Sequence, residues 1–278
     1  MKLVACQIDV AFGDVPRNRS TIERELAAAA DAGAQLAVVP ECALTGYAFP
    51  TFAAAQRAAV ELQSAPIDAL VAAVQRRGTW LVVGLLERAG ERLYNTALLL
   101  GPHGIALHYR KLHLPFLGCD RFVTPGDRPL GVAKTPFGTV GLSICYDGSF
   151  PETARVLKLA GAQLIVLPTN WPAAARISRA YQSIVRAFEN HVHYVACNRV
   201  GREGGFDFLG GSQIVDCDGR VAAQAGEGAE RIVADLDLPA ADRNRLVIVP
   251  GEYELDRIAH RRPDCYGAIV APLAKETR

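Results

Sequence analysis

The feature that most constrains the fold is the alternation of short apolar runs with longer segments rich in Ala, Arg and Glu. Runs of Val, Ile and Leu at 3–9, 35–40 and 163–168 predict strands. The segments 16–34 and 151–162 predict helices, the second with Pro near its start and Gly near its end. Alternation of this kind predicts an α/β fold with parallel strand pairs.

Other apolar runs follow each other too closely to leave room for a helix. Residues 79–88 and 92–100 flank a short turn and predict an antiparallel hairpin, and 131–144 and 211–224 predict two more. Hairpins and helix crossovers therefore coexist, which predicts a mixed sheet or two sheets. No break in composition divides the chain, so we expect one domain over 1–278, with an extended tail from about residue 240 carrying one short helix.

Composition excludes several classes of partner. Thirty basic and 29 acidic side chains leave a net charge of +1, which gives no electrostatic attraction to nucleic acid or an anionic membrane. No apolar run is long enough to span a bilayer. Together with the balanced charge, this predicts neither a nucleic-acid nor a membrane partner. Seven scattered cysteines without a CxxC pair argue against a disulfide framework or a zinc site and favour a cytoplasmic location. No cofactor is expected.

Chemically capable residues stand at the ends of predicted strands. Glu41, Lys111 and Cys145 each end or follow an apolar run, as do Asn170 and Trp171. Ligands of open α/β sheets bind beyond the carboxyl ends of strands, so these residues are expected to converge on one crevice. Each has a simpler interpretation on its own: Glu41 as a loop carboxylate, Lys111 as surface charge and Cys145 as core packing.

The three residue types form a coherent apparatus for acyl transfer. A cysteine attacks a carbonyl as the thiolate, a carboxylate can accept its proton, and an ammonium can neutralise the resulting oxyanion. A helix predicted to begin at Pro151 would stabilise a thiolate at Cys145.

Three segments give the chain its resemblance to a known family. "PECALTGY", "YRKLHLP" and "ICYDGSFPE" resemble the signature segments of the nitrilase superfamily of carbon–nitrogen hydrolases, in the same order. The resemblance implies a four-layer α-β-β-α sandwich, a homodimer or larger homo-oligomer, and a thioester intermediate. It also implies Glu41 as general base, Lys111 as oxyanion stabiliser, Cys145 as nucleophile, and the backbone N–H of Tyr146 as a second oxyanion donor.

One departure from the family concerns a fourth catalytic group. Many members carry a second glutamate shortly after the lysine, where this chain has Cys119 and Asp120. Asp120 either supplies a shorter carboxylate or belongs to loop structure only.

The residues after the cysteine resemble those of the amidase branches. Gly148 and Ser149 stand where branches that hydrolyse N-carbamoyl amino acids often place arginine. The expected reaction is therefore hydrolysis of a small linear, aliphatic amide to an acid and ammonia. An N-carbamoyl amine (ureido) hydrolase or an ω-amidase is the alternative, and a non-catalytic binding protein that retains the fold is the alternative from a different class.

The remaining candidates concern the substrate pocket and a metal. Tyr47, Asn170 and Trp171 are expected to line the pocket, although aromatic residues at such positions also occur in cores. His191 and His193 would share a strand face with Cys197, but His-x-His without a nearby carboxylate is more often packing, so no metal site is expected. The glycine-dense segments 201–205 and 210–211 lack the context of a phosphate-binding loop.

Overall fold

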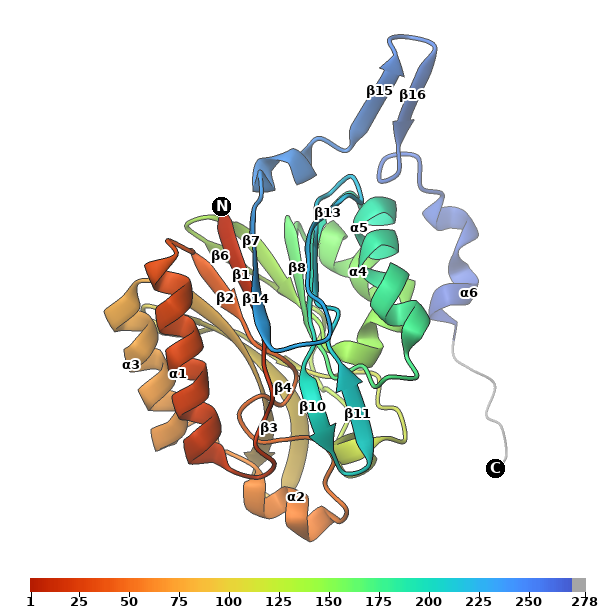
Figure 1. Ribbon diagram of the computed structural model, residues 1–278. Coiled ribbons are helices and arrows are strands. Elements are labelled where there is room, and N and C mark those ends of the chain that lie inside the picture. Colours follow the sequence, from red (N-terminus) through yellow and green to blue (C-terminus); the bar gives the residue numbers. More distant parts are fainter. Residues whose placement is uncertain (272–278) are drawn as a thin grey trace. The chain divides into compact units, whose positions relative to one another are not determined.

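The computed structural model describes residues 1–271, which fall into two compact units, 1–242 and the part from Arg243 onward. The first unit holds two six-stranded mixed sheets and their helices (Figure 1). The division falls close to the expected start of the tail, whereas a single domain over 1–278 stays a prediction.

The first sheet combines parallel strands at its centre with antiparallel strands at both sides. β1 pairs parallel with β2 and β2 with β3, while β3–β4 and β4–β5 are hairpins. Its spatial order is β14 (Glu230–Asp235), β1 (Lys2–Gln7), β2 (Leu36–Val38), β3 (Trp80–Ala89), β4 (Arg92–Gly101), β5 (Gly104–Arg110). The predicted coexistence of crossovers and hairpins is therefore found within one sheet.

The second sheet repeats this arrangement. β7–β8 and β8–β9 are parallel, and the outer pairs are antiparallel. Its order is β13 (Val221–Gln224), β12 (Gln213–Val215), β9 (His193–Cys197), β8 (Leu164–Pro168), β7 (Gly138–Leu142), β6 (Val132–Thr135).

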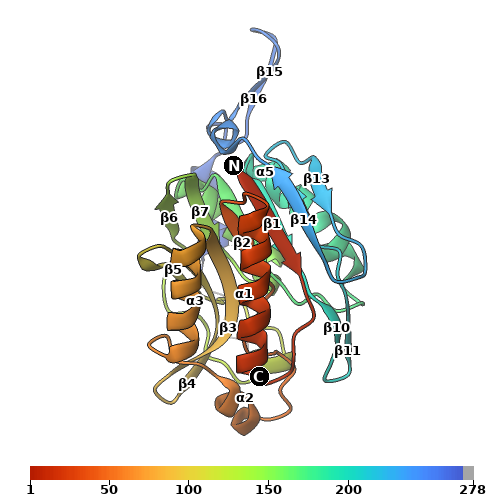
Figure 2. The same cartoon turned by 60° about the vertical axis from the view of Figure 1, so that its left-hand side comes forward.

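Helices cover the outer face of each sheet, and local capping fixes where they begin and end. α1 (Val15–Asp31) and α3 (Ala65–Arg77) lie on the first sheet, as Figure 2 shows, and α4 (Pro151–Leu159) and α5 (Ser183–Asn190) lie on the second. The Asp14 carboxylate accepts the Arg17 N–H at the start of α1, and Gly78 ends α3 in the left-handed conformation. The short α2 spans Phe52–Ala58.

The apolar core between the sheets completes the four layers. Leu3, Val38 and Val82 of the first sheet belong to the same buried cluster as Leu142 and Val166 of the second. Strands with apolar residues on both faces must be covered on both, which explains why helices flank a double sheet. The expected α-β-β-α sandwich is confirmed.

Two hairpins were not predicted from the sequence. β10 (Val200–Glu203) and β11 (Phe206–Leu209) form a two-stranded sheet whose turn is the glycine-dense segment. In the second unit, β15 (Arg245–Val249) pairs with β16 (Tyr253–Asp256) and precedes the short α6 (Gly267–Val270). The tail therefore contains a hairpin as well as the expected short helix.

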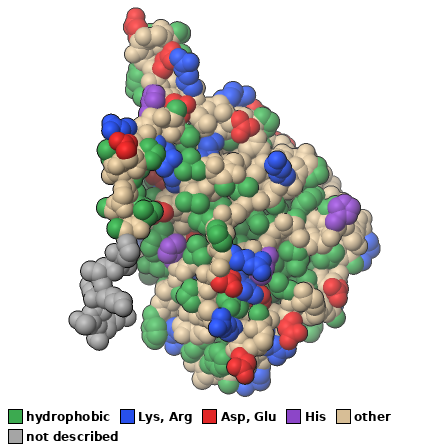
Figure 3. Space-filling view, turned by 180° about the vertical axis from the view of Figure 1, so that it is seen from behind, with side chains coloured by type: hydrophobic (Ala, Val, Ile, Leu, Met, Phe, Trp, Pro, Cys, Tyr) green, Lys and Arg blue, Asp and Glu red, His purple; other side chains and the backbone are tan. Residues whose placement is uncertain are grey.

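The distribution of charge on the surface agrees with the balanced composition. Basic and acidic side chains are interspersed over the face seen in Figure 3 rather than gathered by sign. None of the helices within residues 1–271 is both long enough and apolar enough to cross a membrane.

Candidate active site

The Glu41 carboxylate is held in a buried loop that follows β2. Glu41 is 1% exposed, and Cys42 directly after it has a positive φ of 49°. A Cβ on Gly84 of β3 would lie 2.8 Å from the Glu41 Cα, so only glycine lets the loop pass this strand so closely. One carboxylate oxygen, Oε1, accepts from Lys111 and Asn95, while the buried Oε2 has no hydrogen-bond partner among the residues described.

The Lys111 ammonium lies between two carboxylates. Lys111 follows β5, and its Nζ is 2.8 Å from Glu41 Oε1 and 2.6 Å from Asp120 Oδ2. Burial alone would lower the pKa of Lys111, but the charges of Asp120 and Glu41 outweigh it and hold this pKa well above its ordinary value. Lys111 therefore stays cationic in a site almost closed to solvent.

Asp120 lies beside Lys111, and its role as a fourth catalytic group stays a prediction. It belongs to the short 3-10 helix Gly118–Arg121, and besides Lys111 it accepts from the Tyr47 hydroxyl at 2.9 Å and from Asn95 Nδ2 at 2.9 Å. A Cβ on Gly118 would lie 2.3 Å from the Tyr47 ring, so glycine is needed where this helix meets the ring. Asp120 thus occupies a position from which it orients the lysine.

The Cys145 thiol begins the 3-10 helix Cys145–Ser149 beyond β7. Its φ of 43° is strained for a residue with a Cβ, and such strain is concentrated at functional sites. Cys145 keeps partial exposure, unlike Glu41 and Lys111. Its sulfur interacts electrostatically with both of those groups and accepts from the backbone N–H of Asn170. The structure therefore brings Glu41, Lys111 and Cys145 together, while their catalytic roles and the place of Trp171 in a shared crevice stay predictions.

The pKa of the Cys145 thiol is raised, whereas the nearby helix predicted a lowered pKa. Burial raises the pKa of Cys145, and the negative charge of Glu41 raises it further, although Lys111 acts in the opposite direction. Burial also raises the pKa of Glu41, with a further contribution from Asp120. A carboxylate with a raised pKa is a suitable acceptor for a thiol proton.

Asp147 anchors the turn that carries the cysteine. Its buried carboxylate accepts from the Ile144 N–H at 3.0 Å, the Tyr109 hydroxyl at 2.7 Å and the backbone N–H of His113 at 3.0 Å. His113 Nδ1 is a further 2.7 Å contact. The strained turn is therefore fixed from several sides.

A second buried network holds the loop that carries Glu41. The Glu203 carboxylate accepts from the backbone N–H groups of Tyr47 and Ala48, both at 2.6 Å. Glu203 pairs with Arg199, which is fully buried. This links the β10–β11 hairpin to Tyr47, whose hydroxyl reaches Asp120.

The three residues predicted to line the pocket, Tyr47, Asn170 and Trp171, are all buried. Asn170 is buried, and its side-chain amide has no hydrogen-bond partner within residues 1–271. Tyr47 and Trp171 are buried in apolar clusters, while the Tyr146 ring is exposed and packs edge-on against Phe150. Pocket roles for Tyr47, Asn170 and Trp171, and the oxyanion role of the Tyr146 N–H, stay predictions.

Sequence reasoning missed several supporting residues. Asn95 contacts both Glu41 and Asp120, as Lys111 does, and its signal was an amide inside the apolar strand β4. Asp147 stands two residues after Cys145. Glu203 lies in the glycine-dense segment 201–205, for which no phosphate-binding role was expected. His193 and Cys197 do not join His191 in a metal-ligating cluster within the described residues.

Comparison with known proteins agrees with this geometry. Residues 2–245 match the carbon–nitrogen hydrolase family. The chain is 36% identical over 250 residues to a nitrilase of Pyrococcus abyssi, covering 88% of this chain and 93% of that one. It is 37% identical over 241 residues to an (R)-stereoselective amidase of a Pseudomonas species, covering 86% and 85% respectively.

Solved structures of an amidase from Nesterenkonia share the fold. One superposes with a TM-score of 0.82 at 26% identity, covering 97% of this chain and 96% of that one. Another, at 28% identity and a TM-score of 0.78 over 87% of this chain and 95% of that one, shows acrylamide added to the active-site cysteine. The chain therefore belongs to the carbon–nitrogen hydrolases of the nitrilase superfamily, which act on C–N bonds.

Proposed function

We propose that the protein hydrolyses a small linear, aliphatic amide to a carboxylic acid and ammonia, with Glu41, Lys111 and Cys145 as catalytic residues. The observation that carries the proposal is the buried Lys111 ammonium, held by Glu41 and Asp120 within electrostatic reach of the Cys145 sulfur. The (R)-stereoselective amidase and the Nesterenkonia amidase support the amide as substrate class.

The first half-reaction forms a thioester. The Cys145 sulfur attacks the amide carbon as its proton passes to Glu41, and the oxyanion is stabilised by Lys111 and the Tyr146 N–H. The C–N bond then breaks, and the proton held by Glu41 goes to the departing nitrogen, which leaves as ammonia. Asp120 acts as a positioning residue because it contacts Lys111.

The second half-reaction consumes water. Glu41 accepts a proton from a water molecule, whose oxygen attacks the thioester carbon. The C–S bond breaks, Glu41 returns its proton to the sulfur so that the Cys145 thiol is restored, and the acid leaves. No cofactor takes part in this scheme.

The substrate class is tested with a panel of aliphatic amides, N-carbamoyl amines, ω-amides and nitriles, with ammonia release as the readout. The proposal expects the highest kcat/KM for short linear primary amides. A preference for carbamoyl amines or ω-amides would assign one of the alternative hydrolases, and a preference for nitriles would overturn the amidase assignment. Failure of every class to release ammonia would favour the non-catalytic binding protein.

We expect Asp120→Asn to lower kcat/KM by about tenfold or more, and to move its acid limb to lower pH. The charge of Asp120 raises the pKa of Glu41, so its removal lowers this pKa, and Glu41 stays deprotonated to a lower pH. The measurement is the pH profile of kcat/KM. Asp127→Asn, at an exposed carboxylate that pairs with Arg110, is the matched control. An acid limb that does not move would contradict a coupling between the two carboxylates.

We also propose that two copies pair through the helices on the second sheet. Exposed apolar side chains lie on this face although helix surfaces are ordinarily polar: Val156 and Leu159 on α4, Val185 on α5 and Tyr181 before it. A second copy presenting the same face would cover them.

Val185→Glu is expected to convert the dimer to a monomer, because it would bury a carboxylate in the pairing surface. Sedimentation velocity measures the mass, and Ile105→Glu on β5, also exposed, is the control that should leave the dimer intact. A wild-type monomer, or a Val185→Glu protein with unchanged mass, would contradict the proposal.

The unpaired state of all seven cysteines supports a proposed cytoplasmic location.

A further inference from the structure

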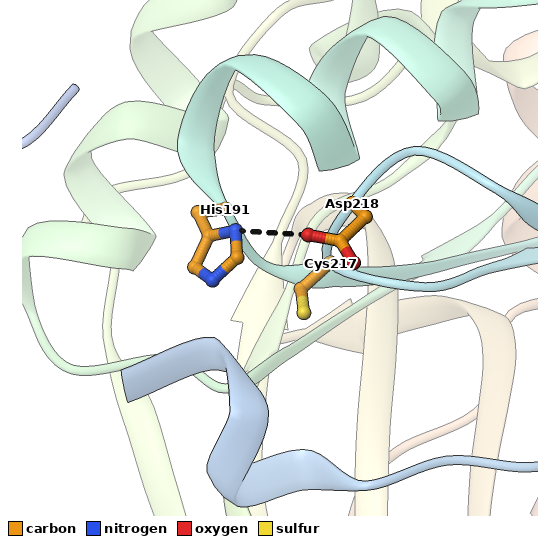
Figure 4. Close-up of side chains that lie close together, drawn as sticks. All are labelled: His191, Cys217 and Asp218. Carbon is orange, nitrogen blue, oxygen red and sulfur yellow. Dashed lines mark ion pairs between the residues drawn. The ribbon is translucent and has the colours of Figure 1, made fainter. Parts of the chain in front are cut away.

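His191, Cys217 and Asp218 form a cluster of metal-ligating side chains that the hydrolase mechanism does not use. His191 ends α5, and Cys217 and Asp218 lie in the turn between β12 and β13 (Figure 4). One ligand atom from each residue lies within 4.8 Å of the others. Nitrogen, sulfur and oxygen donors from two separate segments thus meet at one point.

The hydrogen bonding of His191 leaves one ring nitrogen free to bind a cation. Its Nε2 lies 3.2 Å from the Ala240 carbonyl oxygen, and because a carbonyl only accepts, Nε2 carries the proton in this contact. In the neutral ring, Nδ1 therefore presents its lone pair. A histidine that donates its second N–H to a backbone carbonyl is the arrangement typical of metal ligands.

Nδ1 faces the Asp218 carboxylate at a distance unsuited to a direct hydrogen bond. The separation from Oδ1 is 3.8 Å, whereas Oδ2 of the same carboxylate is 2.9 Å from Arg220 Nη1. Nitrogen and oxygen donors bound to tetrahedral Zn²⁺ at about 2.0–2.2 Å are separated by about 3.3–3.5 Å. The 3.8 Å between Nδ1 and Oδ1 is slightly wider, so small side-chain rotations would bring both atoms to one ion.

The surroundings suit a partly hydrated cation. Cys217 is buried, while the His191 and Asp218 side chains are 14% and 44% exposed, so water can supply a fourth ligand. The site also lies at the C-terminal end of α5, where the helix dipole favours positive charge.

We propose that His191 Nδ1, Cys217 Sγ and Asp218 Oδ1 bind Zn²⁺, with water as the fourth ligand. Three new bonds from the protein form at the metal, and the thiol proton of Cys217 is released to solvent. The ion would join the end of α5 to the β12–β13 turn, and its role would be independent of amide hydrolysis.

The test uses the full chain with Cys145→Ala and Cys265→Ser, which removes the two cysteines that are not buried. We expect one equivalent of Co²⁺ to bind with a thiolate-to-cobalt charge-transfer band, and Zn²⁺ to displace it. Adding Cys217→Ser should abolish the band, and His191→Gln should weaken Co²⁺ binding by at least about tenfold. His103→Ala, at an exposed histidine, should change neither.

Two results would overturn the proposal. One is a band that survives Cys217→Ser, and the other is no stoichiometric Co²⁺ binding by the parent protein. Circular dichroism of each variant confirms folding, and because the readout is spectroscopic, failure here leaves the hydrolase assignment untouched.

Discussion

Cys145→Ala is expected to reduce ammonia release by at least about 10³-fold with any accepted amide, because no other group can form the thioester. The substitution removes only the sulfur, and Lys111, Glu41 and Asp120 keep their mutual contacts. Substrate should therefore still bind while turnover stops. Steady-state ammonia assays and equilibrium binding of the amide separate these two effects.

Cys265→Ser is the matched control for this experiment. Cys265 is exposed and lies in the second unit, so its loss should leave kcat unchanged. Iodoacetamide should inactivate the Cys265→Ser protein and the wild type alike. Substantial turnover by Cys145→Ala would contradict the assignment of the nucleophile.

Lys111→Gln should lower kcat by about 10²–10³-fold, the usual effect of losing one oxyanion stabiliser. It should also destabilise the fold by about 3–5 kcal/mol, because two buried carboxylates lose the cation between them. Ammonia assays and urea denaturation measure the two effects. Lys134→Gln, at an exposed lysine of β6, should change neither.

A second variant separates catalysis from folding. Adding Asp120→Asn to Lys111→Gln removes one of the unpaired carboxylates, so part of the lost stability should return while activity should not. If activity returns with stability, Lys111 holds the site together and takes no part in the chemistry.

Hydrophobic patterning predicted part of the fold, and the family resemblance supplied the rest. Strand and helix alternation, with hairpins wherever two apolar runs lie close together, predicted a mixed sheet or two sheets, and the resemblance implied the four layers. The β10–β11 hairpin was missed because its turn is glycine-dense and its strands are short. The β15–β16 hairpin was missed because an Arg- and Pro-rich segment does not show the alternation of a half-buried strand.

The part of the candidate site that could be predicted consists of residues at the ends of strands. Glu41, Lys111 and Cys145 stand where apolar runs end, a position visible in the sequence. Asn95 lies inside a strand, where an amide gives no sign of which groups it bridges. The raised pKa of Cys145 could not be predicted from the sequence, because it results from burial and from the charge of Glu41, which only the folded protein reveals.

The most direct test of the central claim is intact mass spectrometry of the Glu41→Gln protein after brief exposure to an accepted amide. Loss of the general base slows attack of water on the thioester, so an acyl adduct on the peptide that contains Cys145 should accumulate. Prior replacement of Cys145 by alanine should abolish the adduct. An adduct that persists on the Cys145→Ala protein, or that maps to another residue, would contradict a Glu-Lys-Cys hydrolase centred on Cys145.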